Sequence, residues 1–185
     1  VFFRRPALTG TGNGLDNVLR GNDNGNTLSG LGGNDWIYGN AGVDILNGDD
    51  GNDWLFGGTG TDTPNGGIGN DVTWGESEND TMNGGAGNDT FYGGTGNDTM
   101  NGGTGNDIYY VDDVGDVVVE GVLPLLNGFD TVYASITETL DANVENLTLT
   151  GIGNTSGNGN ASANLIKGNA GNNVLNGRAG ADRME

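Results

Sequence analysis

Nine aspartates recur at a constant interval of nine residues. They are Asp35, Asp44, Asp53, Asp62, Asp71, Asp80, Asp89, Asp98 and Asp107. Carboxylates can take part in acid–base chemistry or bind hard cations through oxygen. The repetition directs attention to cations, because carboxylates that lie close together repel one another unless a cation lies between them. The question is then which elements would bring these side chains together.

Glycine sets the same interval as aspartate. It opens each of eleven consecutive nine-residue windows, at positions 12, 21, 30, 39, 48, 57, 66, 75, 84, 93 and 102, and it also fills position 4 of eight windows. Because glycine tolerates left-handed backbone, positions 1 to 6 are expected to form a tight turn. Positions 7 to 9 are expected to form a short strand, in which the usually apolar position 8 points inward.

Two such windows would make one coil of a flattened solenoid, so windows two apart would stack with their strands about 4.8 Å apart. The aspartates then form two columns, Asp35, Asp53, Asp71, Asp89 and Asp107 in one and Asp44, Asp62, Asp80 and Asp98 in the other. Flexible, all-oxygen sites made of carboxylates and turn carbonyls suit Ca²⁺ better than Mg²⁺ or Zn²⁺. One ion in each gap of a column predicts about seven Ca²⁺ ions, with Asp107 at the end of its column.

The composition points in the same direction. The formal net charge of −19 argues against nucleic acid and anionic membrane surfaces as partners, and seven Ca²⁺ ions would reduce it to −5. No apolar run is long enough to span a membrane. One apolar side chain per nine residues buries little surface, so we expect the chain to be disordered without calcium and folded with it.

Enzyme chemistry finds little support in the chain. It has no His and no Cys, which excludes an HExxH zinc site, a Ser-His-Asp triad, a Cys-His pair and disulfides. Paired carboxylates can cleave glycosides, and five glutamates are available: Glu76, Glu78, Glu120, Glu138 and Glu145. We interpret these as solvated charges and expect no catalytic activity.

The segments "GGAGNDTFY", "GGTGNDTMN" and "GGTGNDIYY" follow the pattern G-G-x-G-x-D-x-U-x. The chain therefore resembles the RTX, or hemolysin-type calcium-binding repeat, family. The resemblance implies an all-β fold, a right-handed parallel β-roll or β-helix solenoid of nonapeptide repeats with calcium in the turns. It also implies a secreted, extracellular bacterial protein exported by type I secretion, in which calcium triggers folding and the roll supports an adjacent domain.

Four segments are expected along the chain: a lead-in at 1–11, the β-roll at 12–110, an irregular β segment at 111–158 with looser turns around Pro124, and a degenerate, truncated second repeat segment at 159–185. The last segment ends within the repeat pattern, so we expect the chain to be a fragment. Calcium occupancy stays open at five places. Asparagine replaces the repeat aspartate at four of them, and the fifth is the aspartate of the degenerate segment: Asn17, Asn26, Asn164, Asn173 and Asp182. Two alternatives also stay open for Asp112, Asp113 and Asp116: they could bind calcium, or they could form a solvated turn without an ion.

The two outward faces differ. One carries an aromatic row, with Tyr38, Phe56, Trp74, Tyr92 and Tyr110 at position 9. It could stabilise its own sheet, dock an adjacent domain or bind polysaccharide, as the similarity to repeat modules of alginate epimerases and adhesins implies. The other face carries a Thr and Asn array, which resembles calcium-dependent ice-binding adhesin segments.

Three substitutions interrupt the pattern close together: Pro64 and Thr73 at inward positions, and Glu78 at a turn glycine position, where it is expected to adopt a positive φ. Residues 57–83 should therefore be the weakest part of the roll. The columns also predict that Asp71→Ala removes about two ions and Asp107→Ala one.

Overall fold

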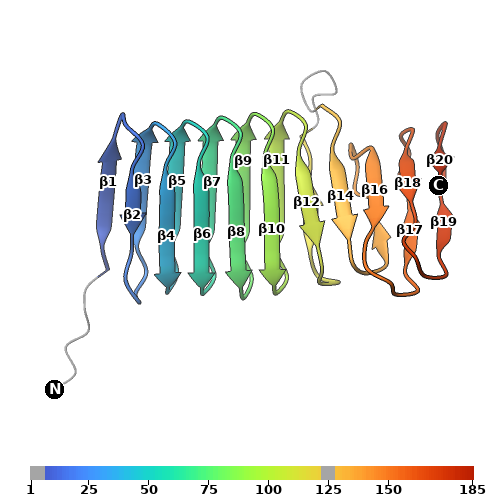
Figure 1. The fold of residues 1–185 in the computed structure, drawn as a ribbon, viewed down its shortest axis with the longest axis horizontal. Coiled ribbons are helices and arrows are strands. Elements are labelled where there is room, and N and C mark those ends of the chain that lie inside the picture. Colours follow the sequence, from blue (N-terminus) through green and yellow to red (C-terminus); the bar gives the residue numbers. More distant parts are fainter. Residues whose placement is uncertain (1–6, 122–127) are drawn as a thin grey trace.

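The structure is a computed structural model that describes residues 7–121 and 128–185. Within these ranges the chain forms twenty β-strands and no helix. The strands stack in coils along one long axis, and the coils build a flattened solenoid (Figure 1). Every strand pair is parallel. The predicted all-β parallel solenoid is confirmed.

Successive strands alternate between two faces of the solenoid. The first sheet contains β1 (Thr9–Asn13), β3 (Thr27–Gly32), β5 (Ile45–Asp50), β7 (Thr63–Ile68), β9 (Thr81–Ala86), β11 (Thr99–Thr104) and β13 (Val117–Val119). The second contains β2 (Val18–Arg20), β4 (Trp36–Ala41), β6 (Trp54–Thr59), β8 (Val72–Ser77), β10 (Thr90–Thr95), β12 (Ile108–Val111), β14 (Thr131–Ala134), β16 (Asn146–Leu149), β18 (Leu165–Lys167) and β20 (Arg183–Met184). A short third sheet contains β15 (Glu138–Thr139), β17 (Ser156–Asn158) and β19 (Val174–Asn176).

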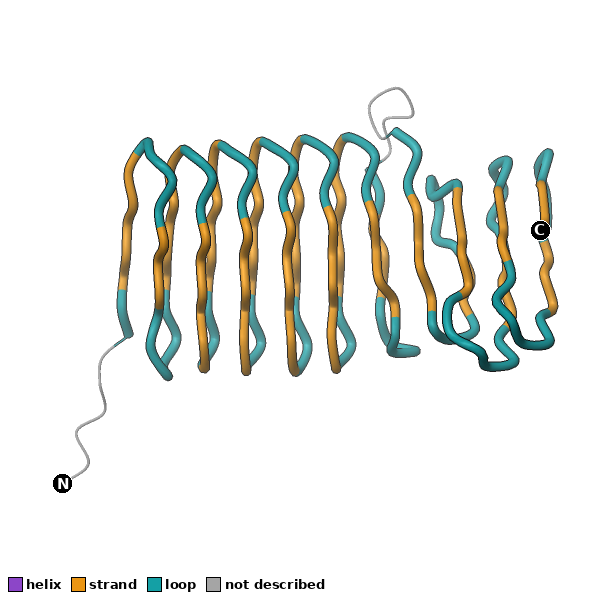
Figure 2. The backbone as a smooth tube through the Cα atoms, in the orientation of Figure 1, coloured by secondary structure: helices purple, strands orange, loops and turns teal. Residues whose placement is uncertain are grey.

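The strands of the regular coils are longer than the glycine pattern predicts. β4 has 6 residues and includes Gly39, where a turn is expected. Positive φ occurs instead at positions 2 and 4 of the window, as at Asn40 (φ 79°) and Gly42 (φ 119°). Only the three residues between β4 and β5, 42–44, form the turn (Figure 2). The expectation of a six-residue turn is therefore wrong.

The first glycine of each window is required for space. Gly48 faces the interior, where an added Cβ would lie 2.2 Å from Oδ2 of Asp53 and 2.6 Å from the carbonyl oxygen of Gly66. Such contacts are far closer than van der Waals packing allows. Any side chain at this position would displace the aspartate or the backbone of the next coil.

The inward row at position 8 forms the apolar core, as predicted, but the core is in two parts. One cluster contains Leu28, Ile37, Leu46 and Leu55, and the other begins at Met82 and continues to Ile166. Between them lie the buried side chains of Pro64 and Thr73. The hydroxyl of Thr73 contacts the sulfur of Met82 at 3.5 Å. Glu78 has φ 72°, which confirms the expectation for that position.

The second sheet continues beyond the regular repeats. Ile108 pairs with Thr131, Thr131 with Asn146, and Asn146 with Leu165, so the coils there contain 23, 15 and 19 residues. The chain between residues 111 and 158 thus contributes coils of unequal length to the same solenoid. Residues 1–6 of the lead-in segment and the turns expected around Pro124 lie outside the described residues. In the part of the chain that the structure describes, no helix is long and apolar enough to cross a membrane.

Candidate metal centre

The nine predicted aspartates lie in two columns inside the solenoid. Each immediately precedes a strand, and each stacks on the aspartate eighteen residues away. Their side chains are at most 2% exposed. The alternation of coils thus brings together, in each column, the carboxylates that the sequence predicts to be neighbours.

Hydrogen bonds fix the orientation of every carboxylate in the columns. The backbone N–H of Asp35 donates to Oδ1 of Asp53 at 2.7 Å, and the N–H of Asp53 donates to Oδ1 of Asp71 at 2.8 Å. The same bond recurs from coil to coil in both columns. Because the backbone of one coil holds the carboxylate of the next, rotation of these side chains is restricted. The columns are therefore preorganised.

The second oxygen of each carboxylate has no hydrogen-bond partner. This holds for Oδ2 of all nine aspartates, although these atoms are buried. Oδ2 of Asp53 and the carbonyl oxygen of Gly66 both lie within 2.6 Å of the point where Cβ of residue 48 would be. Two acceptor oxygens cannot bond to each other, and an unpaired buried carboxylate is costly. The arrangement requires a cation or a proton between the oxygens.

Burial makes the ionised state of these carboxyls unfavourable. It raises the pKa of Asp71, Asp80 and Asp89 to about 7 and that of Asp53 and Asp62 to about 6. The backbone N–H bonds oppose this effect in part, and the neighbouring aspartates of each column add to it. A pKa of 6 to 7 in place of 3.8 makes each ionised carboxyl roughly 3–4 kcal/mol less stable.

The donor set fits calcium. Each gap in a column offers carboxylate and backbone carbonyl oxygens and neither nitrogen nor sulfur, which is the ligand chemistry of hard divalent cations. The glycine interior leaves room for an ion, since a Cβ would occupy the same space. Asp35, Asp53, Asp71, Asp89 and Asp107 would hold ions in one column, and Asp44, Asp62, Asp80 and Asp98 in the other.

The sequence pattern predicts that the first column ends at Asp107, but the column continues beyond this residue. The N–H of Asp107 donates to Oδ1 of Asp130 at 2.8 Å, and the N–H of Asp130 donates to Oε2 of Glu145 at 3.0 Å. Asp130 is fully buried and its Oδ2 has no partner. The segment from Gly128 to Val132 follows the G-x-D-x-U pattern, but the coil of 23 residues hides it from a count by nines.

In the second column, Asp116 stacks on Asp98 and accepts its backbone N–H on Oδ1 at 3.1 Å. Its Oδ2 accepts the N–H groups of Asp112 and Asp113. Both oxygens of Asp116 are thus engaged, so this residue closes the column with hydrogen bonds from its own turn.

The asparagines at the aspartate position behave differently from the aspartates. Nδ2 of Asn164 donates to the carbonyl of Val144 at 3.0 Å, and Nδ2 of Asn173 donates to the carbonyl of Thr155 at 2.8 Å. The amide hydrogens of asparagine therefore bond to carbonyl oxygens directly, whereas a carboxylate has no hydrogen to donate and needs a cation or a proton there. Asn17 and Asn26 accept backbone N–H groups within their own turns, and Asp182 accepts the N–H of Asn164 at 3.0 Å.

The predicted aromatic row forms a continuous stack on the second sheet. Its ring centroids lie 4.4–5.3 Å apart with interplanar angles of 5–16°, through Tyr38, Phe56, Trp74, Tyr92, Tyr110 and Tyr133. The guanidinium carbon of Arg20 lies 4.0 Å from the ring centroid of Tyr38. Ring faces inside the row are therefore covered by neighbouring rings.

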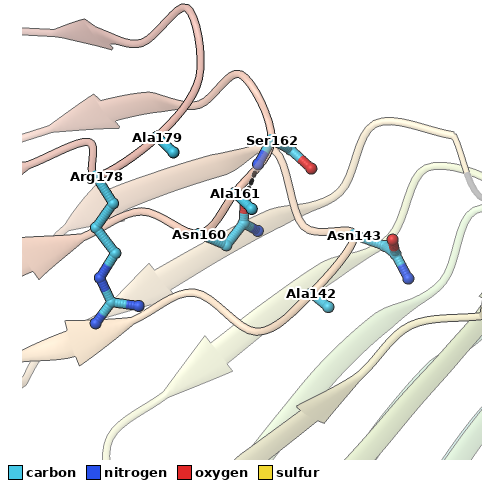
Figure 3. A pocket seen from close by; sticks show the side chains of 7 residues that line it. All are labelled: Ala142, Asn143, Asn160, Ala161, Ser162, Arg178 and Ala179. Carbon is cyan, nitrogen blue, oxygen red and sulfur yellow. Dashed lines mark hydrogen bonds between the residues drawn. The ribbon is translucent and has the colours of Figure 1, made fainter.

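A surface cavity of about 470 Å³ lies away from the columns, among the turns of the C-terminal coils (Figure 3). Its lining consists of Ala142, Asn143, Asn160, Ala161, Ser162, Arg178 and Ala179. The N–H of Ser162 donates to Oδ1 of Asn160 at 2.8 Å. No carboxylate is among these lining residues.

Comparison with known protein families finds the RTX calcium-binding nonapeptide repeat in four copies, at residues 11–46, 38–73, 74–109 and 150–185. No curated protein matches the chain. The four copies cover more than half of the sequence and contain all nine aspartates of the columns. The chain belongs to the RTX calcium-binding nonapeptide repeat family.

Proposed function

We propose that this chain is a calcium-binding β-roll module of a secreted bacterial RTX protein, in which calcium binding drives folding. The observation that carries the proposal is the row of buried, unpartnered Oδ2 atoms in both columns. Calcium supplies the missing charge, and its binding free energy becomes folding free energy. Folding outside the cell would support type I secretion and place an adjacent domain on a rigid support.

The physical basis for coupling calcium to folding is the cost of the metal-free state. Desolvation raises the pKa of the column carboxyls well above 3.8, so the folded chain resists ionising them at neutral pH. The unfolded chain ionises them freely in water. In a calcium-poor compartment the acidic chain would therefore stay unfolded, the state needed for passage through a narrow export channel.

The proposal gives the module no catalytic role. The carboxylates in the columns are held by backbone N–H groups inside the solenoid and are shielded from solvent. A substrate could reach these carboxylates only if the stacked coils separated. Any enzymatic or toxic activity would belong to the adjacent domain that the roll supports.

Polysaccharide binding and ice binding remain alternatives with less support from the geometry. Sugar rings stack on exposed aromatic faces, whereas the faces of Phe56, Trp74 and Tyr92 are covered by their neighbours. On the other sheet, Nδ2 of Asn65 donates to Oδ1 of Asn47 at 3.0 Å and Nδ2 of Asn83 to Oδ1 of Asn65 at 2.8 Å. These amides satisfy one another along the sheet, which leaves fewer groups to order water or contact a ligand.

Titration of calcium into the metal-free protein tests the proposed function. Far-UV circular dichroism should show a steep transition from coil to β-structure, and equilibrium dialysis should count about seven ions in the repeat gaps, plus one between Asp107 and Asp130. Magnesium at the same concentrations should not produce the transition, because its octahedral geometry suits these sites poorly. A protein already folded in excess chelator at neutral pH, or one that binds no more than two ions, would contradict the proposal.

A further inference from the structure

Glu120 occupies an interior position that every earlier coil of the first sheet gives to glycine. β13 pairs with β11 in the register Thr99 to Val117 and Asn101 to Val119, so the next residue, Glu120, stacks on Gly102. The glycines before it in this row are Gly12, Gly30, Gly48, Gly66, Gly84 and Gly102. Glu120 is 8% exposed, so its interpretation as a solvated charge is wrong.

The side chain of Glu120 reaches the end of the first aspartate column. Oxygen atoms of Asp107, Glu120 and Asp130 all lie within 4.8 Å of one another, and all three residues are buried. Tyr109 donates its hydroxyl to Oε1 of Glu120. Oδ2 of Asp107 lies 2.3 Å, and Oε1 of Glu120 2.7 Å, from the point where Cβ of residue 102 would be. Three carboxylates thus converge on one small volume.

Each of these carboxylates has an oxygen without a partner: Oδ2 of Asp107, Oε2 of Glu120 and Oδ2 of Asp130. The cationic side chains among residues 7–121 and 128–185 are engaged elsewhere, over the ring of Tyr38, beside Glu185 or in the surface cavity: Arg20, Lys167, Arg183 and Arg178. No cationic side chain in the described part of the chain therefore neutralises these carboxylates, and a bound cation or a proton must supply the positive charge.

We propose that Asp107, Glu120 and Asp130 hold a Ca²⁺ ion in a three-carboxylate site that is distinct from the repeat sites and releases its ion more slowly than they do. The repeat gaps offer two column carboxylates each, and Ca²⁺ affinity rises with ligand charge and site rigidity. The inference rests on the calcium-binding function proposed above, because Asp107 and Asp130 belong to the first column.

The location gives the site a structural consequence. Glu120 directly follows β13, the last strand of the first sheet, whereas Asp130 directly precedes β14 of the second sheet. An ion shared by Glu120 and Asp130 would tie the end of β13 to the start of β14 within the 23-residue coil, at the point where the regular repeats stop. It would close the regular roll with a metal cross-link.

Calcium release into a chromophoric chelator, followed by stopped flow on the calcium-loaded chain, tests the site. The wild type should release one ion in a phase slower than the rest. Glu120→Gln keeps an acceptor for the Tyr109 hydroxyl but removes one charge, so the slow phase should accelerate about tenfold or more. Glu76→Gln, an exposed glutamate with the same change in charge, should leave the slow phase unchanged.

Glu120→Gly supplies a second variant that restores the glycine of the earlier coils. It too should lose the slow phase, while circular dichroism in saturating calcium should retain the β-structure. An unchanged slow phase in either folded Glu120 variant, or a wild type that releases all its ions in one phase, would overturn the three-carboxylate site. A wild type that binds no calcium would instead contradict the proposed function of the columns.

Discussion

At the scale of single residues, the two oxygens of each column aspartate have different tasks. Oδ1 accepts a backbone N–H from the preceding coil, as Asp71 does from Asp53 at 2.8 Å. Oδ2 is left for a cation. The asparagines at this position accept an N–H from their own turn instead, and Asn164 also donates its amide hydrogens to the carbonyl of Val144. We therefore expect the presence of aspartate or asparagine at position 6 to separate coils that bind an ion from coils that need none.

Substitution along one column should reveal how ions are shared. Asp71 has aspartates on both sides, Asp53 and Asp89, so Asp71→Ala should remove about two ions. Asp35 has Asn17 on one side and Asp53 on the other, so Asp35→Ala should remove one. Equilibrium dialysis followed by atomic absorption gives the counts. Equal losses in the two variants would contradict ions shared between adjacent aspartates.

The structure changes the number of ions that Asp107→Ala is expected to remove. Because Asp130 continues the column, Asp107→Ala should remove two ions and not the single ion expected of a terminal residue. The nine-residue count could not find Asp130, since the interval from Asp107 is 23 residues. The sequence pattern nevertheless located all nine repeat aspartates, because their positions depend only on local spacing.

At the scale of the strand and turn, the sequence predicted the direction of side chains better than the length of elements. The apolar residues at position 8 from Leu28 to Tyr109 are buried and Leu19 is partly buried, as the alternation of a strand requires. Turn length was mispredicted because glycine meets two different demands here. Gly42 adopts φ 119°, whereas Gly48 is needed for space beside Asp53. The sequence does not show which of these two roles a glycine has. The packing of adjacent coils in the structure does.

The turns also contain a second row of side chains that helps hold the coils together. The N–H of Asn52 donates to Oδ1 of Asn34 at 2.9 Å, and the N–H of Asn70 donates to Oδ1 of Asn52 at 2.7 Å. These bonds lie at the exposed surface and pair backbone N–H groups of the turns that cannot pair as in a strand. Asparagine and aspartate at adjacent positions thus extend coil-to-coil bonding through the turns.

The interrupted core predicts the least stable coils. Pro64 lacks an N–H, Thr73 places a hydroxyl in the interior, and the two apolar clusters separate at these residues. Amide hydrogen exchange of the calcium-bound protein should be fastest, among residues 30–110, within residues 57–83. A difference of about tenfold corresponds to about 1.4 kcal/mol in opening free energy.

A repaired variant provides the control for this expectation. Pro64→Leu with Thr73→Leu restores the apolar row seen at Leu46 and Leu55, and should slow exchange in the same segment while leaving residues 90–110 unchanged. Uniform protection of the wild type across residues 30–110 would show that the break in the core does not weaken the roll.

At the scale of the whole molecule, the aspartate columns are continuous where the apolar core is not. Asp62, Asp71 and Asp80 span the region between the two clusters, and their coil-to-coil hydrogen bonds are unbroken. Cations in these columns would therefore connect the two halves of the solenoid. Under the proposed function, a chain with a net charge of −19 would depend on such ions, since little else offsets the repulsion between its carboxylates.

This dependence has a pH signature in the metal-free protein. The carboxyls have an ordinary pKa of 3.8 in the unfolded chain, whereas burial raises the pKa to about 7 for Asp71, Asp80 and Asp89. The folded state therefore binds more protons than the unfolded state between these values, and its stability must fall as pH rises through about 7.

Acidification from pH 8 to pH 5 should therefore increase the β-structure of the metal-free protein, measured by far-UV circular dichroism after the chelator has been removed. Replacing Asp71, Asp80 and Asp89 with asparagine should reduce this pH dependence, because these side chains would no longer titrate. With calcium bound, the effect of acid should reverse, since protons compete with Ca²⁺ for the same Oδ2 atoms and ions are released. A metal-free protein whose circular dichroism stays constant between pH 8 and pH 5 would contradict the view that charge on the buried columns keeps the roll unfolded.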